Sequence, residues 1–168
     1  MLILLLFLQF ILLMILIIIF FRGIKFIKIF VDEKRLPKEL LERRKTYIKP
    51  KINNRQLILS KWSLYMGIFF VGIAILMSYI NITISTFIIG IALLLLTCYL
   101  LTIKKIQFKI NDIKRSYINK HSDNDLEFSY LTLVDFNNYK TYINHLSFIF
   151  ILLSIVFFLI SLILYMVV

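Results

Sequence analysis

The sequence predicts an all-α membrane protein with four transmembrane helices, an N-out/C-out orientation and two basic cytoplasmic loops that carry short amphipathic helices. Of the 168 residues, 61% are apolar, and the mean hydropathy is +0.90, whereas a soluble domain is about 45–50% apolar. The apolar residues form uncharged blocks of about twenty, the length that crosses a bilayer as a helix. All twenty Lys and Arg residues fall between these blocks.

The positive charge sets the expected orientation. Thirteen Lys and Arg residues lie within 22–61 and the other seven within 104–145. Short loops rich in Lys and Arg stay on the cytoplasmic side of a membrane. With the N-terminus outside, every basic residue is cytoplasmic, and with it inside, every one would be translocated. We therefore expect cytoplasmic loops at 22–62 and 104–145.

The chain reads as one integral membrane domain, 1–168, with spans at about 2–21, 63–80, 84–103 and 146–168. The first span lacks the basic start and small-residue cleavage site of a signal peptide, so we expect an uncleaved anchor. Trp62 occupies the position of an aromatic-belt residue before the second span. The small residues of that span predict that it packs inside the bundle. Residues 81–83 are expected to form the tight turn that follows it.

The two loops carry further helical patterns. Pro37 suits the first position of a short amphipathic helix over 36–48. In the second loop, apolar residues recur at steps of three and four, which predicts that the third helix continues into the cytoplasm and lays this face either on the membrane surface or on the first loop. These residues are Ile103, Ile106, Ile110, Ile113 and Tyr117. We expect Asn137 and Asn138 to break regular structure before the last span.

Each half of the chain reads as a span, a basic loop and a second span in the same orientation. A parallel duplication, as occurs in transporters, is one interpretation. The other is that four spans and two loops produce this pattern without any repeat.

Five residues of the spans are candidates for helix packing: Gln9, Gly67, Gly72, Thr86 and Gly90. A buried amide such as that of Gln9 hydrogen-bonds across membrane helices for about 1–2 kcal/mol at best, and small residues let helices approach closely. The alternative for the glycines is that Gly is simply common in membrane helices.

Eight residues of the first loop are candidates for contact with anionic lipid headgroups or with an acidic partner. Juxtamembrane clusters of this kind bind such lipid at about 1 kcal/mol for each Lys or Arg. They are Lys34, Arg35, Lys38, Arg43, Arg44, Lys45, Lys49 and Lys51. The simpler alternative is that this charge only orients the chain. Because the charge borders apolar spans, we do not expect nucleic-acid binding.

We predict no catalytic, cofactor-binding or metal-binding residues. The predicted spans contain no Asp, Glu, Lys, Arg or His, the groups that usually mark ion pathways and proton relays. His121, Asp123 and Asp125 are close in the sequence, but one His with two carboxylates in a polar loop is expected to be solvated rather than a metal site. The single Cys98 closes no intrachain disulfide.

These features predict a small non-enzymatic, multi-pass membrane protein. An accessory or immunity-type protein that acts on a membrane, secretion or transport partner fits them best. The alternative is an oligomeric transport or pore-forming subunit whose polar lining includes Ser154 and Ser161. Heavy use of Ile, Lys, Asn, Phe and Tyr points to an AT-rich genome, from which we expect a bacterial plasma membrane. No stretch carries a motif specific enough to indicate a family.

Overall fold

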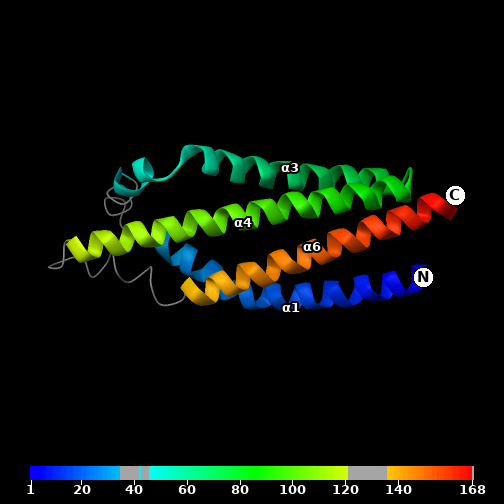
Figure 1. Ribbon diagram of the computed structural model, residues 1–168, viewed down its shortest axis with the longest axis horizontal. Coiled ribbons are helices and arrows are strands. Elements are labelled where there is room, and N and C mark those ends of the chain that lie inside the picture. Colours follow the sequence, from blue (N-terminus) through cyan, green and yellow to red (C-terminus); the bar gives the residue numbers. More distant parts are fainter. Residues whose placement is uncertain (35–41, 43–45, 121–135, 168) are drawn as a thin grey trace.

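Four long helices run side by side in the computed structural model (Figure 1). They are α1 (Leu2–Lys34), α3 (Asn54–Ser78), α4 (Ile82–Lys120) and α6 (Phe136–Val167), with the short 3-10 helix η1 (Lys49–Lys51) before α3. The structure describes residues 1–34, 42, 46–120 and 136–167, and within these every side chain except those of 25–34, 114, 115, 117–120 and 136. The described chain is helical without strands, and four helices are long and apolar enough to cross a membrane. The predicted all-α class is therefore confirmed, as is the number of helices long and apolar enough to cross a membrane.

The helices form a row whose order in space is α3, α4, α6, α1 (Figure 1). The central helices α4 and α6 pack on each other, α3 packs on α4, and α1 packs on α6. Neighbours in the row are antiparallel, so both chain termini and the α3–α4 turn lie at one end (Figure 1). The helix ends that border the two basic loops lie at the other end, which we call the basic end.

The packing does not repeat between the two halves of the chain. In the second half α4 and α6 are direct neighbours, whereas in the first half α1 and α3 lie at opposite edges of the row (Figure 1). This difference favours the interpretation in which four spans and two loops produce the sequence pattern without a duplication.

The helices extend past the predicted spans, since hydropathy detects the uncharged stretch and not the helix itself. α1 continues to Lys34, and α3 begins at Asn54, so Trp62 lies inside a helix and is exposed there. The Lys, Arg, Gln and Leu residues next to the spans are good helix formers and continue the helices into polar surroundings.

The expected break before the last helix is wrong. Asn137 and Asn138 lie in the first turn of α6, which begins at Phe136. Asn disfavours helix interiors because its side chain competes for nearby backbone groups, but the first turn has unpaired N–H groups and tolerates it.

The extension of α4 beyond its span is confirmed, because this helix ends only at Lys120. Ile106 and Ile113 of the predicted stripe are buried, with exposed fractions of 2% and 9%, and Ile103 and Ile110 are half-buried. The stripe therefore faces the packed side of α4. The side chain of Tyr117 and most of the helix predicted over 36–48 lie outside the described residues.

The turn between α3 and α4 occupies residues 79–81 rather than 81–83. The side-chain Oδ1 of Asn81 accepts a hydrogen bond from the backbone N–H of Ile84, 3.1 Å away. Asn is a preferred residue at this position because its oxygen satisfies a free N–H of the first helical turn. Ile82 and Thr83 therefore already belong to α4.

Small residues hold α3 close to α4. Ser60, Gly67 and Ala74 follow one another at intervals of seven on α3, and all three are buried. Seven residues are two helical turns, so the three share one face, as in antiparallel coiled coils. Only this face of α3 is covered, and the helix lies at the edge of the row instead of inside a bundle as predicted.

The apolar core lies where α1, α6 and α4 meet. Its larger cluster combines two residues of α1 with four of α6: Leu5, Leu12, Ile149, Leu153, Val156 and Ile160. The buried or half-buried residues of α1 recur at alternating steps of three and four along its apolar part, and they are Leu2, Leu5, Gln9, Leu12, Leu16, Ile19 and Gly23. This period of 3.5 is that of a helix seated on one partner. Most of the remaining surface of α1 is apolar and exposed.

Candidate functional site

Serine hydroxyls join α6 to α4 inside the membrane-spanning part. Ser154 donates a hydrogen bond to the backbone oxygen of Gly90 at 2.8 Å, and Ser161 donates to that of Thr83 at 3.0 Å. Ser161 follows Ser154 by seven residues on α6, and its partner Thr83 precedes Gly90 by seven residues on the antiparallel α4. This fixes the register of the two helices, and we call their contact the α4–α6 seam.

The next step along the α4–α6 seam brings Ser147 to the level of Thr97. Thr97 donates to the backbone oxygen of Leu93 in its own helix at 2.9 Å. The hydroxyl of Ser147 is buried and has no hydrogen-bond partner in the described part of the chain. Three serines with the same spacing therefore differ, since two join the helices and the third does not.

Alanine substitutions are expected to distinguish a serine that is hydrogen-bonded to the neighbouring helix from a buried serine that is not. Ser154→Ala should lower the free energy of unfolding by about 0.6–1.7 kcal/mol, the range measured for hydrogen bonds between membrane helices. Ser147→Ala should leave that free energy unchanged or raise it, because it removes a buried hydroxyl that makes no hydrogen bond to the described residues. Denaturant titration of both variants in detergent micelles measures the difference. A larger loss for Ser147→Ala would contradict the seam described above.

Gly90 leaves no room for a side chain in the α4–α6 seam. A Cβ atom built on this residue would lie 2.6 Å from Cε1 of Phe158. The Phe158 ring also packs on Phe87, with ring centroids 5.3 Å apart. The nearby Thr86 is half-buried and donates its hydroxyl hydrogen to the backbone oxygen of Thr83 at 2.9 Å.

The two glycines of α3 lie on different sides of the helix. Gly67 faces α4, where an added Cβ would lie 2.9 Å from Cδ2 of Leu96. Ser85 donates to the backbone oxygen of Ala74 at 2.8 Å on the same face. Gly72 is exposed, and an added Cβ there would meet no atom within 4 Å. Within this chain Gly67 is thus in a helix contact, whereas contact at Gly72 requires another molecule.

Gln9 lies half-buried on the face of α1 that packs against α6. Its side chain makes no hydrogen bond to the residues that the structure describes. The predicted role of Gln9 in joining helices stays a prediction.

The basic residues of the first loop are only partly described. Arg35, Lys38, Arg43, Arg44 and Lys45 lie outside the described residues, as does the side chain of Lys34. Lys49 and Lys51 are exposed in η1. The ammonium group of Lys51 lies 3.5 Å from the centre of the Tyr47 ring, a cation–π contact that holds the charge at the surface.

Groups of side chains suited to binding a metal ion are absent from the described ranges. No three His, Cys, Asp or Glu residues gather there in a way that could hold a metal ion, and the free thiol of Cys98 is exposed on α4. The trio of His121, Asp123 and Asp125 lies outside the described residues.

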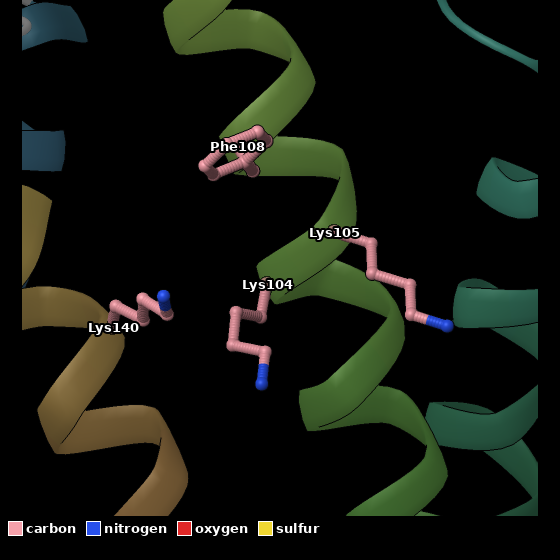
Figure 2. A pocket seen from close by; sticks show the side chains of 4 residues that line it. All are labelled: Lys104, Lys105, Phe108 and Lys140. Atoms are coloured by element: carbon pink, nitrogen blue, oxygen red, sulfur yellow. The ribbon is translucent and has the colours of Figure 1, made fainter.

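The sequence reading missed a basic pocket at the basic end of α4 and α6. Lys104, Lys105, Phe108 and Lys140 line this pocket, which has a volume of about 170 Å³ (Figure 2). In the sequence, Lys104 and Lys105 are simply the first two residues of the predicted second loop, 104–145. The signal that could have found the pocket is the separation of fourteen residues, twice the spacing of seven, that relates both Lys104 to Gly90 and Lys140 to Ser154.

Comparisons with protein-family models, with curated proteins and with solved structures find no match to this chain.

Proposed function

We propose that this chain is a non-enzymatic membrane protein of accessory or immunity type, which acts by binding another protein within the bilayer. The observation that carries the proposal is the inward direction of its polar groups. Ser85, Ser154 and Ser161 all give their hydroxyl hydrogens to backbone oxygens of neighbouring helices. These contacts use three hydroxyl groups of the spans for folding, while most of the exposed surface of the spans is apolar and suited to contact with lipid or protein.

The outer edge of α3 is the part of this surface best suited to a partner helix. Gly72 forms a notch there because no atom lies within 4 Å of its missing Cβ. Ile68, Ile75 and Leu76 around it are more than half exposed. Small residues flanked by apolar side chains let membrane helices approach closely. A single-span or multi-span membrane protein with a matching apolar helix is the partner we expect.

The oligomeric pore has less support. A pore built from uncharged spans needs hydroxyl groups that face a shared water-filled path. Ser154 and Ser161, the candidates for that lining, have exposed fractions of 0% and 6%, and both are hydrogen-bonded across the α4–α6 seam. Opening a pore along them would break those bonds.

The orientation and the location belong to the same proposal. The helix ends that border both basic loops lie together at the basic end (Figure 1), as the positive-inside rule requires if that end is cytoplasmic. We therefore place both termini outside and the cluster from Lys34 to Lys51 against anionic headgroups of a bacterial plasma membrane. An exposed Lys49 and an exposed Lys51 are compatible with such contact.

Site-specific photo-crosslinking in native membranes tests the partner proposal. A photoreactive residue in place of Leu76, on the outer edge of α3, should capture a different integral membrane protein. The same residue in place of Ile18, exposed on α1 at the other edge of the row, serves as the positional control. Adding Gly72→Leu should abolish capture from position 76, because its side chain fills the notch. Adducts formed only between copies of this chain would instead support the pore, and ion leakage from liposomes would then be measured.

A further inference from the structure

The basic pocket on α4 and α6 lies at the border between the apolar spans and the polar ends of their helices. Lys104 and Lys105 directly follow the uncharged stretch 82–103, and Lys140 precedes the uncharged stretch 146–168. This border is the level of the lipid headgroups in a membrane. The pocket therefore lies where phosphate groups are concentrated, whichever side of the membrane the basic end faces.

The α4–α6 seam brings two of these lysines to the same level. Lys104 follows Gly90 by fourteen residues and Lys140 precedes Ser154 by fourteen, so the register set by the Ser154–Gly90 bond continues to this pair. Figure 2 shows the Lys104, Phe108 and Lys140 side chains on the side where α4 faces α6, whereas the ammonium group of Lys105 points to the other side of α4. Two ammonium groups are thus directed toward one pocket.

The charge of this pair has no carboxylate partner in the described part of the chain. The only hydrogen bond from these ammonium groups to a described residue is that of Lys104 Nζ to Oδ1 of Asn144, at 2.8 Å. An ammonium group has three donors and no acceptor, so Lys104 keeps donors available after this bond. The two ammonium groups, held at the same depth along the helices, repel each other, and an anion bound between them would offset this repulsion.

The size of the pocket limits the anion. Its volume of about 170 Å³ is well below the roughly 300–1,000 Å³ of sites that enclose a drug-sized ligand. A phosphate group fits, while acyl chains would have to remain outside. The exposed ring of Phe108 beside the pocket offers an apolar surface for the part of a lipid next to its headgroup.

From this geometry we infer that Lys104 and Lys140 form a binding site for a phosphate oxyanion, the phosphodiester of an anionic lipid or a free phosphate. The ammonium group of Lys105 points away from Lys104 and Lys140, so Lys105 adds positive charge nearby but is not expected to contact the phosphate. The site is separate from the Lys34–Lys51 cluster and does not depend on the proposed function. Basic pockets between transmembrane helices are known as sites for anionic headgroups.

Ligand-induced stabilisation of the purified full chain in a neutral detergent tests this inference. Titrations with phosphatidylglycerol, with phosphatidylcholine and with inorganic phosphate are compared by the shift in melting temperature. Each interfacial lysine contributes about 1 kcal/mol, which corresponds to a factor of about 5 in affinity. We therefore expect a loss of about 5-fold for Lys104→Gln or Lys140→Gln and about 30-fold for the pair. Lys61→Gln, an exposed lysine of α3, removes the same charge elsewhere and should change affinity less than 2-fold.

The arms of the experiment distinguish the sources of the phosphate. Stabilisation by phosphatidylglycerol alone identifies a lipid site, and stabilisation by millimolar inorganic phosphate identifies a site for the soluble anion. Lys104→Arg keeps the charge and should keep binding. Asn144→Ala removes the Lys104–Asn144 contact and leaves the charge of Lys104 in place, so unchanged binding in this variant separates loss of the ligand from loss of that contact. Equal stabilisation by phosphatidylcholine would overturn the inference, as would equal losses in the double variant and in Lys61→Gln.

Discussion

Gly90→Leu is expected to separate α6 from α4 and to give the largest loss of stability among single substitutions in the spans. Any side chain at this position starts 2.6 Å from the Phe158 ring, and that ring cannot move away freely because it packs on Phe87. Overpacking of this kind costs about 1–3 kcal/mol and occasionally more. Displacing α6 would also remove the hydrogen bond from Ser154 to the Gly90 backbone oxygen. Titration with a denaturing detergent measures the loss in the free energy of unfolding.

Gly72→Leu is the matched control for this substitution. It makes the same chemical change in a neighbouring span, at a position with no atom within 4 Å of the new Cβ. Leu is also a better helix former than Gly by nearly 1 kcal/mol in soluble helices. We expect the free energy of unfolding to stay within about 0.5 kcal/mol of the parent or to rise. An equal loss in the free energy of unfolding for Gly90→Leu and Gly72→Leu would contradict the placement of Gly90 in a helix contact and of Gly72 on the exposed surface.

The comparison of Gly67, Gly72 and Gly90 shows how far the sequence could predict helix contacts. All three are glycines in apolar spans, and all three were predicted to pack against other helices because small residues let membrane helices approach closely. The structure follows a spacing of seven instead: Ser60, Gly67 and Ala74 share one face of α3, and Gly72 lies off it. The spacing of seven can be read from the sequence. Which helix covers that face of α3 depends on the order of the helices in space, which the sequence does not show.

The long apolar runs predicted the helices well, because a bilayer core requires every backbone group to be bonded within the segment. The helix ends were less predictable. Asn54, Phe136 and Lys120 lie in polar surroundings, where hydropathy gives no signal and helix propensity decides. For the same reason two neighbouring Asn residues read as a break although they begin α6.

The basic pocket could not be read from the sequence, since it depends on a register between two helices. Lys104 and Lys140 are thirty-six residues apart, and the packing of α6 on α4, with the Ser154–Gly90 and Ser161–Thr83 bonds, brings them to the same depth. By contrast, the positive charge of the first loop is visible without any structure. The residues that set orientation are thus local in sequence, whereas those that form a site are not.

The second large effect is expected from thiol labelling, which reads out the orientation of the chain. The background is Cys98→Ser, because the free thiol of Cys98 is exposed. Tyr79→Cys places a thiol in the α3–α4 turn, at a position with an exposed fraction of 87%. Lys51→Cys places one in η1, on the loop side of α3. A membrane-impermeant thiol reagent applied to intact cells should label Tyr79→Cys nearly completely and Lys51→Cys only at background level.

The physical reason is the distribution of positive charge between the two ends of the row. Turning the chain over would place all twenty Lys and Arg residues outside, against the bias that governs insertion of short loops. Permeabilising the cells should make Lys51→Cys as reactive as Tyr79→Cys, which controls for burial of the thiol. Labelling of Lys51→Cys alone in intact cells would reverse the orientation. In that case the cluster from Lys34 to Lys51 would face the outside, and its role at the cytoplasmic leaflet would be lost. The phosphate site of Lys104 and Lys140 would remain testable on the opposite leaflet.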